Sequence, residues 1–232
     1  MGEVRAMPPR GRYLAHEVGW LAGVSGDRIG QWARRGYIAA SQSSDAPPYE
    51  YSYQDVAEAM IIHDLLERGV DLQAIKRAIE TLREDPQFGD WPLAKAVFWV
   101  PRRTDGSPKR GKRASPSLVV EAGGRRHDVG VSRRAWQEVL TTADLERVAS
   151  DLRRGGWAVR EMPDLRFVEV DPDRLSGRPT IKGRRIPAQD VAETAETVGG
   201  KRLLKREYEL TDAQIRDAQR WWRAVQGWQD AA

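Results

Sequence analysis

The stretch that decides the fold spans residues 17–42 and reads EVGWLAGVSGDRIGQWARRGYIAASQ. It divides into two short segments of helical spacing at Gly23-Val24-Ser25, where Ser25 is a suitable N-cap for the second segment. The apolar residues expected to pack the two helices together are Val18, Leu21, Val24, Ile29 and Trp32, and Trp20 is expected to lie in the same core. This pattern predicts a helix-turn-helix, a unit that places its second helix in the major groove of DNA.

The polar side of the second helix carries the side chains suited to reading bases. Arginine and glutamine form paired hydrogen bonds with guanine and adenine, respectively. The helix therefore predicts a DNA-contacting set of Arg28, Gln31, Arg34 and Arg35.

The sequence that follows predicts a wing and two more helices. Residues 37–53 are rich in Ser, Pro and Tyr, and we expect two strands at 37–39 and 49–53 joined by a loop through Pro47 and Pro48. Helices are predicted at 55–68 and 71–85, with Asp71 as the N-cap of the second. Residues 1–90 are thus interpreted as one domain.

Residues 13–84 resemble the MerR superfamily in the stretch quoted above, in YSYQDV at 51–56 and in LLERGVDLQAIKRAI at 65–79. The resemblance implies a winged DNA-binding head, usually dimeric, with Arg28, Gln31 and Arg35 on its recognition helix. It also implies a wing that carries Ser41, Ser43, Tyr51 and Tyr53. The chain departs from the family in two respects, because residues 39–53 contain no arginine and the long dimerising coiled coil is missing.

Charge is distributed unevenly along the 232 residues, whose formal net charge is +4. Residues 1–90 hold 10 Lys and Arg against 14 Asp and Glu, residues 91–134 hold 11 against 3, and residues 135–232 hold 17 against 17. The basic centre indicates a polyanion or an acidic protein as partner. The acidic balance of residues 1–90 favours the alternative of a helical scaffold that has lost DNA binding.

The middle segment, 91–170, is predicted to be rich in strands, at 95–100, 117–121, 126–131, 157–161 and 165–170. A basic loop at 101–116 and a helix or helix pair at 132–154 are expected between these strands. The loop contains six basic residues: Arg102, Arg103, Lys109, Arg110, Lys112 and Arg113.

The last segment, 171–232, opens with DPDRLSGRPTIKGRRIP at 171–187. Its glycines and prolines predict a hairpin at 179–186, followed by helices at 188–198, 201–206 and 212–226, the last capped by Thr211. The motif DPxxxxGxPxIxGxRIP resembles a small domain of bacterial antitoxins, and with the MerR-like head the chain resembles the larger VapB-type antitoxins. This resemblance implies a toxin partner, commonly a ribonuclease of the PIN type.

A PIN nuclease holds divalent metal on clustered carboxylates, to which arginine can form two parallel hydrogen bonds. The hairpin therefore predicts a toxin-binding set of Arg178, Lys182, Arg184 and Arg185. Adjacent Trp221 and Trp222 point about 100° apart on a helix, which makes both hard to bury in one small domain. Because tryptophan is enriched at interfaces, we expect Trp221, Trp222 or Trp228 to contact a partner.

Catalysis, cofactors and metal are not expected. The chain has no cysteine, which excludes disulfides and thiolate metal sites, and it contains no GxSxG, HExxH or phosphate-binding GxxxxGK[ST] motif. No catalytic residue is assigned, since His16, His63 and His127 fall on different elements. The absence of an apolar span and of a leader predicts a soluble, cytoplasmic protein.

The sequence as a whole predicts a mainly helical α+β protein with a MerR-like winged helix-turn-helix, a strand-rich middle and a C-terminal hairpin with helix-turn-helix-like helices. The function expected is that of a type II antitoxin, a homodimer that binds and neutralises a PIN-type ribonuclease and represses its own operon by binding an operator. Two alternatives stay open: a MerR-like regulator that senses a small molecule, and a protein-interaction module without DNA binding.

Overall fold

The structure is a computed structural model that describes residues 8–83, 97–99, 119–122, 125–128, 138–140 and 142–230. The head helices are α1 (Ala15–Ala22), α2 (Gly26–Arg34), α3 (Tyr53–Glu67) and α4 (Leu72–Arg83). Two of their predicted caps are present, since Ser25 accepts a hydrogen bond from the Arg28 amide and Asp71 accepts one from the Ala74 amide. The caps explain why both helices begin where the sequence predicts.

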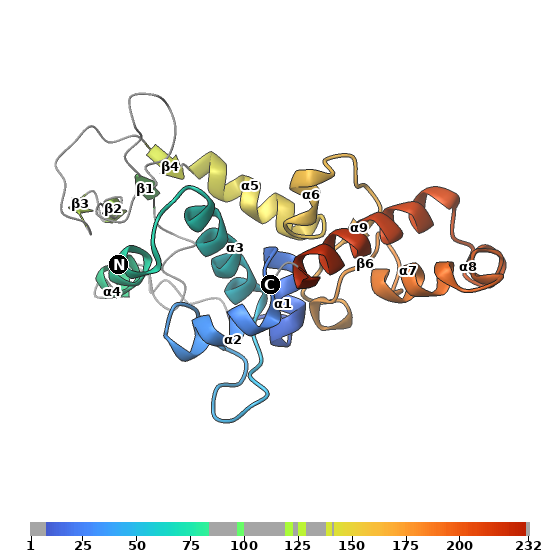
Figure 1. Cartoon of the computed structure of the whole chain (residues 1–232), viewed down its shortest axis with the longest axis horizontal. Coiled ribbons are helices and arrows are strands. Elements are labelled where there is room, and N and C mark those ends of the chain that lie inside the picture. Colours follow the sequence, from blue (N-terminus) through green and yellow to red (C-terminus); the bar gives the residue numbers. More distant parts are fainter. Residues whose placement is uncertain are drawn as a thin grey trace.

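The remaining elements confirm a mainly helical α+β fold (Figure 1). The strands of the middle segment are β1 (Val97–Trp99), β2 (Val119–Ala122), β3 (Arg125–Asp128) and β4 (Glu138–Leu140). They form one antiparallel sheet of order β3-β2-β1-β4, in which Phe98 lies opposite Val120 and Val120 opposite His127. The later elements are α5 (Thr142–Arg153), α6 (Ala158–Glu161), β5 (Val168–Glu169), the 3-10 turn η2 (Leu175–Gly177), β6 (Thr180–Ile181), α7 (Ala188–Glu196), α8 (Gly200–Glu207) and α9 (Asp212–Asp230).

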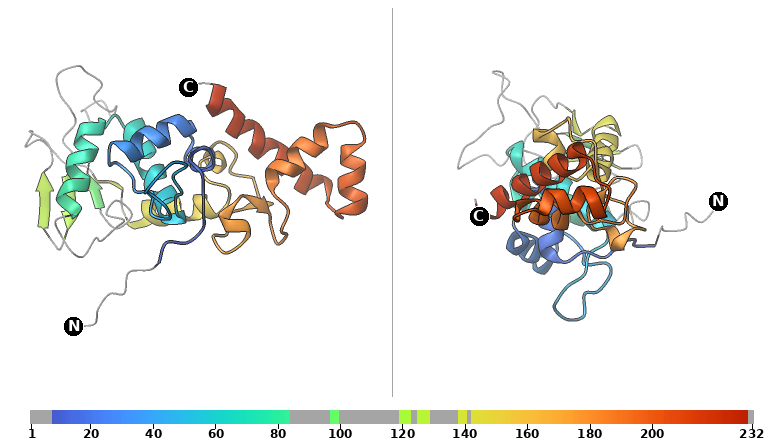
Figure 2. Two further views of the ribbon diagram at one scale, coloured as in Figure 1. Left: turned by 90° about the horizontal axis from the view of Figure 1, so that it is seen from below. Right: turned by 90° about the vertical axis from the view of Figure 1, so that its right-hand side faces the viewer.

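The core of the head extends beyond the predicted boundary at residue 90. Buried side chains of α1 to α4 form one apolar cluster, which also contains Val148 and Leu152 of α5 and Val170. Helix α5 packs against α3, so a helix from the middle of the sequence completes the head. The head and α7–α9 lie toward opposite ends of the molecule (Figures 1 and 2).

A second apolar cluster holds the C-terminal elements together. It is formed mainly by side chains of α7 to α9, with Val168 of β5, Ile181 of β6 and residues of α6. It also contains Trp20, which we expected to lie in the helix-turn-helix core and which instead faces away from it. Helix α1 therefore contributes Leu21 to one core and Trp20 to the other, because a helix turns by about 100° at each residue.

Three element predictions for the middle segment need correction. Residues 138–140, inside the predicted helix or helix pair 132–154, form strand β4 against β1, and helix α5 follows from Thr142. Residues 158–161 form helix α6 rather than a strand, and β5 pairs with β6 of the hairpin instead. Positive φ angles at Gly155 and Gly156 turn the chain sharply before α6, which prevents an extended conformation there.

The basic loop 101–116 lies outside the described residues, and so do residues 132–137 of the predicted helix. Within the described part of the chain, no helix is long and apolar enough to cross a membrane.

Candidate nucleic-acid interface

The turn between α1 and α2 is built on close contact of the two helix backbones. Gly23 ends α1 with a φ of 74°, a left-handed conformation that favours glycine. A Cβ atom added to Gly19 would lie 2.5 Å from the Val24 carbonyl oxygen, and one added to Gly26 would lie 2.8 Å from the His16 Cα. Only glycine at positions 19 and 26 permits this crossing, and the sequence analysis did not identify that requirement.

Helix α2 has one buried and one exposed side. Ile29 and Trp32 are buried against the head core, as predicted. The predicted DNA-contacting residues of the helix and its C-cap are all exposed: Arg28, Gln31, Arg34 and Arg35. The side that the sequence predicts to face DNA is therefore accessible to a large partner.

The arginines of α2 differ from most other arginines of the head in having no carboxylate partner. Arg10, Arg12 and Arg68 form ion pairs with Asp173, Glu50 and Asp64. By contrast, the following arginines form no ion pair with any residue that the structure describes: Arg28, Arg34 and Arg35. The overall acidic balance of residues 1–90 therefore does not neutralise this helix.

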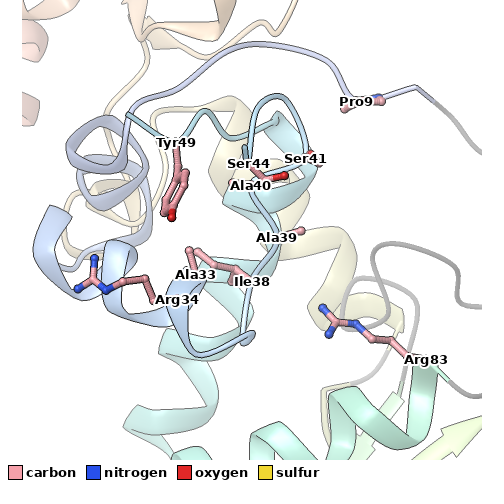
Figure 3. Close-up of a pocket in the computed structure, with 10 residues that line it drawn as sticks. All are labelled: Pro9, Ala33, Arg34, Ile38, Ala39, Ala40, Ser41, Ser44, Tyr49 and Arg83. Carbon is pink, nitrogen blue, oxygen red and sulfur yellow. The ribbon is translucent and has the colours of Figure 1, made fainter. Parts of the chain in front are cut away.

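A pocket of about 840 Å³ lies between the end of α2 and the loop that follows it. Arg34 of α2 and Arg83 of α4 lie on opposite sides of the pocket, and the Tyr49 side chain is directed into it (Figure 3). Small residues make up much of the wall: Ala33, Ala39, Ala40, Ser41 and Ser44. This pocket, called the groove below, therefore combines open space with two guanidinium groups, an arrangement that suits a nucleic-acid backbone.

The wing is a loop rather than the predicted pair of strands. Within the described residues its strand-like pairing is limited to two isolated bridges, one between Ser43 and Glu50 inside the wing and one between Tyr51 and Tyr13. The loop nevertheless projects from the body of the molecule beside α2 (Figure 1). Prolines at positions 47 and 48 remove two backbone donors, which limits strand pairing at the tip.

Three of the four predicted DNA contacts in the wing have structural roles. The Ser41 hydroxyl lies 2.6 Å from an oxygen of Asp55, which in turn accepts a hydrogen bond from the Ser52 amide at the start of α3. Tyr51 is fully buried, and burial raises the pKa of its hydroxyl to about 12. Tyr53 is half-buried in the first turn of α3. The assignment of Tyr51 to DNA is wrong, because its side chain is completely buried. The Ser41 hydroxyl is engaged by Asp55, but the residue lines the pocket, so its contact with DNA stays a prediction.

The hairpin before α7 has its predicted tip at Lys182 and Gly183, but its cations are not equivalent. Arg178 forms an ion pair with Glu17 of α1 at 3.3 Å, and the Arg184 guanidinium donates to the Tyr208 carbonyl at 3.3 Å. Lys182 and Arg185 are exposed. Of the predicted toxin-binding set, these two are free to reach a partner, whereas Arg178 connects the hairpin to the head.

The prediction that the tryptophans of α9 face a partner is wrong for Trp221 and Trp222. Trp221 is completely buried and donates its indole N–H to the Gly155 carbonyl at 2.8 Å. Trp222 packs edge-on against Trp20, with ring centroids 5.1 Å apart. Both are buried because α9 lies between two elements, the turn before α6 and helix α1, which supply one apolar surface for each ring.

The turn before α6 joins the two cores, and sequence reasoning missed it. The Trp157 amide donates to the Leu21 carbonyl at 2.7 Å, which satisfies a terminal carbonyl of α1. A Cβ on Gly156 would lie 2.4 Å from that same oxygen. The approach is so close that only glycine at position 156 fits, and no local sequence pattern signals it.

Charged and aromatic groups surround Trp157. Arg160 lies over its ring and forms ion pairs with Asp64 of α3 and Asp151 of α5, at 2.7 and 3.1 Å. The His63 ring contacts the Trp157 ring, with centroids 4.2 Å apart, and burial lowers the pKa of its imidazole. Together these contacts fix α1, α3, α5 and α6 to one another. No group of three or more His, Asp or Glu side chains in the described regions is placed to hold a metal ion.

Comparison with known proteins agrees with this arrangement at both ends of the chain. Residues 13–82 match the model of the MerR HTH family regulatory protein, and residues 168–221 match that of a protein of unknown function, DUF433. No curated protein matches significantly. The crystal structure of Rv2018 from Mycobacterium tuberculosis is similar in fold, with a TM-score of 0.50 at 18% identity over 92% of this chain and 97% of that one. The chain therefore carries a MerR-family helix-turn-helix domain at its N-terminus and a DUF433 domain at its C-terminus.

Proposed function

We propose that this protein is a transcription regulator that binds operator DNA through α2. The observation that carries the proposal is the exposed side of α2, where Gln31 is accompanied by three arginines that form no ion pair with the described part of the chain. Arginine and glutamine are suited to guanine and adenine edges, and each bidentate contact discriminates by about 1–3 kcal/mol against the wrong base. The projecting loop and the groove with Arg34 and Arg83 lie beside this helix and would contact the DNA backbone.

The protein acts as a homodimer in this proposal, as heads of this family usually do. Two α2 helices related by a two-fold axis would read half-sites about one helical turn apart, so the operator is a pseudo-palindrome. Selection of bound duplexes from a random pool tests this directly. We expect an inverted repeat, and Gln31→Ala is expected to relax selection at one position in each half-site without changing the spacing.

The same selection separates α2 from the rest of the surface. Arg184→Ala serves as the matched control, because it removes a guanidinium from the C-terminal domain. It is expected to return the same motif as the unmodified protein. Recovery of no motif by the unmodified protein, or loss of the motif in Arg184→Ala, would contradict the assignment of recognition to α2.

We further propose that the protein is an antitoxin, which neutralises a ribonuclease of the PIN type encoded beside it and represses the shared operon. The order of a MerR-like head and the DPxxxxGxPxIxGxRIP domain supports this, and so do the exposed cations Lys182 and Arg185 on the hairpin. Arginine and lysine there would pair with the carboxylates that hold the nuclease metal. Linking two heads through the toxin would raise their effective concentration at the operator.

Co-expression with the adjacent reading frame tests the antitoxin proposal. A stable complex and rescue of growth are expected, with rescue weakened by Lys182→Glu combined with Arg185→Glu. Arg28→Ala combined with Arg35→Ala is the matched control, and it should lose operator binding while still rescuing growth. Absence of both a complex and rescue would refute the antitoxin role and leave the DNA-binding role intact.

A further inference from the structure

A second concave site lies far along the chain from α2, where the end of α5, strand β5 and the tip of the hairpin meet. Its volume is about 360 Å³, at the small end of the range for ligand pockets. Four cationic side chains line it: Arg153, Arg154, Arg166 and Lys182. Leu165 and Val168, both buried, form its apolar part.

The carboxylates near this pocket are already neutralised. Glu169, which also lines it, forms an ion pair with Arg174 and accepts a hydrogen bond from the Gly183 amide at 2.9 Å. Asp164 is held by both terminal nitrogens of Arg220, at 2.7 and 2.8 Å. Neither carboxylate is therefore available to offset the four cations.

The four cationic side chains are not neutralised by carboxylates of the described residues, so their charge can act on a bound anion. The Arg154 guanidinium is fixed by two neutral acceptors, the carbonyls of Pro163 and Leu165, at 2.6 and 3.2 Å. Arg153, Arg166 and Lys182 are exposed and form no ion pair with any residue in the described parts of the chain. One positioned guanidinium and three adaptable cations thus converge on one small pocket.

We propose that this pocket binds a phosphate group, carried by a nucleotide or by a nucleic-acid backbone. A phosphate presents several strong acceptor oxygens, which match the fork of a guanidinium, and as a monoester it carries more charge than a carboxylate. The apolar wall of Leu165 and Val168 would pack against the attached sugar or base. None of the pocket residues belongs to α2, so the site is independent of the proposed operator contact.

Titration of inorganic phosphate into the isotope-labelled full-length protein, at constant ionic strength, tests the proposal through the side-chain N–H signals of arginine. We expect saturable shifts in a small set of these signals, and weaker ones with acetate. Arg166→Ala combined with Lys182→Ala should weaken phosphate binding at least 10-fold without changing the melting temperature. Lys201→Ala combined with Arg202→Ala removes the same charge from the exposed side of α8 and should bind phosphate as the unmodified protein does.

Three results would overturn the proposal: no saturation in the unmodified protein, equal binding of acetate, or equal loss in both double variants. Adenosine monophosphate and a random-sequence duplex then identify the source of the phosphate. Both are added to a protein that also carries Arg28→Ala, Arg34→Ala and Arg35→Ala, which separates this site from α2. Tighter binding of the nucleotide than of phosphate indicates a nucleotide site, whereas displacement of phosphate by the duplex alone indicates a backbone contact.

Discussion

Helix α2 and the hairpin before α7 are both short, basic segments next to a glycine turn, yet their arginines have different surroundings. On α2, Arg28, Arg34 and Arg35 extend into solvent on the side opposite Ile29 and Trp32. On the hairpin, Arg178 is paired with Glu17 of the head and Arg184 with a carbonyl after α8. The hairpin belongs to the C-terminal domain and packs against remote segments of the chain, so half of its cations stabilise the chain itself.

This difference shows where a periodic sequence pattern is sufficient to predict which side chains are free to contact a partner. In an amphipathic helix the exposed face follows from the buried one, so the free residues of α2 could be assigned from spacing alone. A hairpin has no such rule, because its neighbours come from remote parts of the chain. The four predictions that follow test this contrast, from the largest expected effect to the smallest.

Trp221→Ala should have the largest effect on folding. The variant removes a completely buried indole and its hydrogen bond to Gly155, so we expect a loss of about 4 kcal/mol in the free energy of unfolding. Denaturant unfolding measures this. Trp228→Ala, at a half-buried position of the same helix, is the control and should cost less than about 2 kcal/mol. A stable Trp221→Ala protein that had lost a partner would instead restore the interface interpretation.

Gly156→Ala tests the contact between the turn before α6 and helix α1. The added Cβ would meet the Leu21 carbonyl at 2.4 Å, at a residue whose φ is 77°, so we expect a cost of about 3 kcal/mol. Gly183→Ala is the matched control, because its φ is 73° but no atom lies within 4 Å of the new Cβ. It should cost only about 1 kcal/mol. Equal costs would show that the close approach contributes nothing.

Ser41→Ala separates the structural role of the wing from a role in DNA binding. The loss of the hydrogen bond to Asp55 should lower the free energy of unfolding by about 1 kcal/mol. We expect operator affinity to remain unchanged when it is measured below the unfolding transition. Ser43 pairs with Glu50 through its backbone, so the Ser43→Ala protein should be stable within about 0.5 kcal/mol of the unmodified protein. Weaker DNA binding by the folded Ser41→Ala protein would show that Ser41 also contacts DNA.

Because His63 is a buried histidine, we expect the stability of the protein to depend weakly on pH. Burial lowers the pKa of the folded imidazole below its ordinary value of 6.5, with Arg28 and Arg160 acting in the same direction and Glu67 opposing them. The unfolded chain therefore takes up the proton first, so stability is full above pH 6.5 and falls as the pH drops below that value. His63→Gln should reduce the slope of the free energy of unfolding against pH, and His16→Gln, at an exposed position, should not. An unchanged slope in His63→Gln would assign the effect to another group.

The residues that sequence reasoning placed correctly share a local cause. Ser25 and Asp71 cap helices, and the buried and exposed sides of α2 follow from spacing within nine residues. The errors share a remote cause. Trp20, Gly156 and Trp221 belong to contacts between segments more than 60 positions apart, and nothing near them in the sequence records those contacts.

The salt dependence of operator affinity tests the central claim, recognition by α2, most directly. Each phosphate contact contributes about 0.9 to the slope of log affinity against log salt concentration on duplex DNA. Replacing Arg28, Arg34 and Arg35 together by alanine should weaken binding at every salt concentration and lower that slope by about 1, because Arg34 is the one of the three that is assigned to the DNA backbone. The control replaces Lys201, Arg202 and Arg223, three exposed cations of α8 and α9, and should keep the original slope. An unchanged slope in the α2 variant, or an equal fall in the control, would contradict the account.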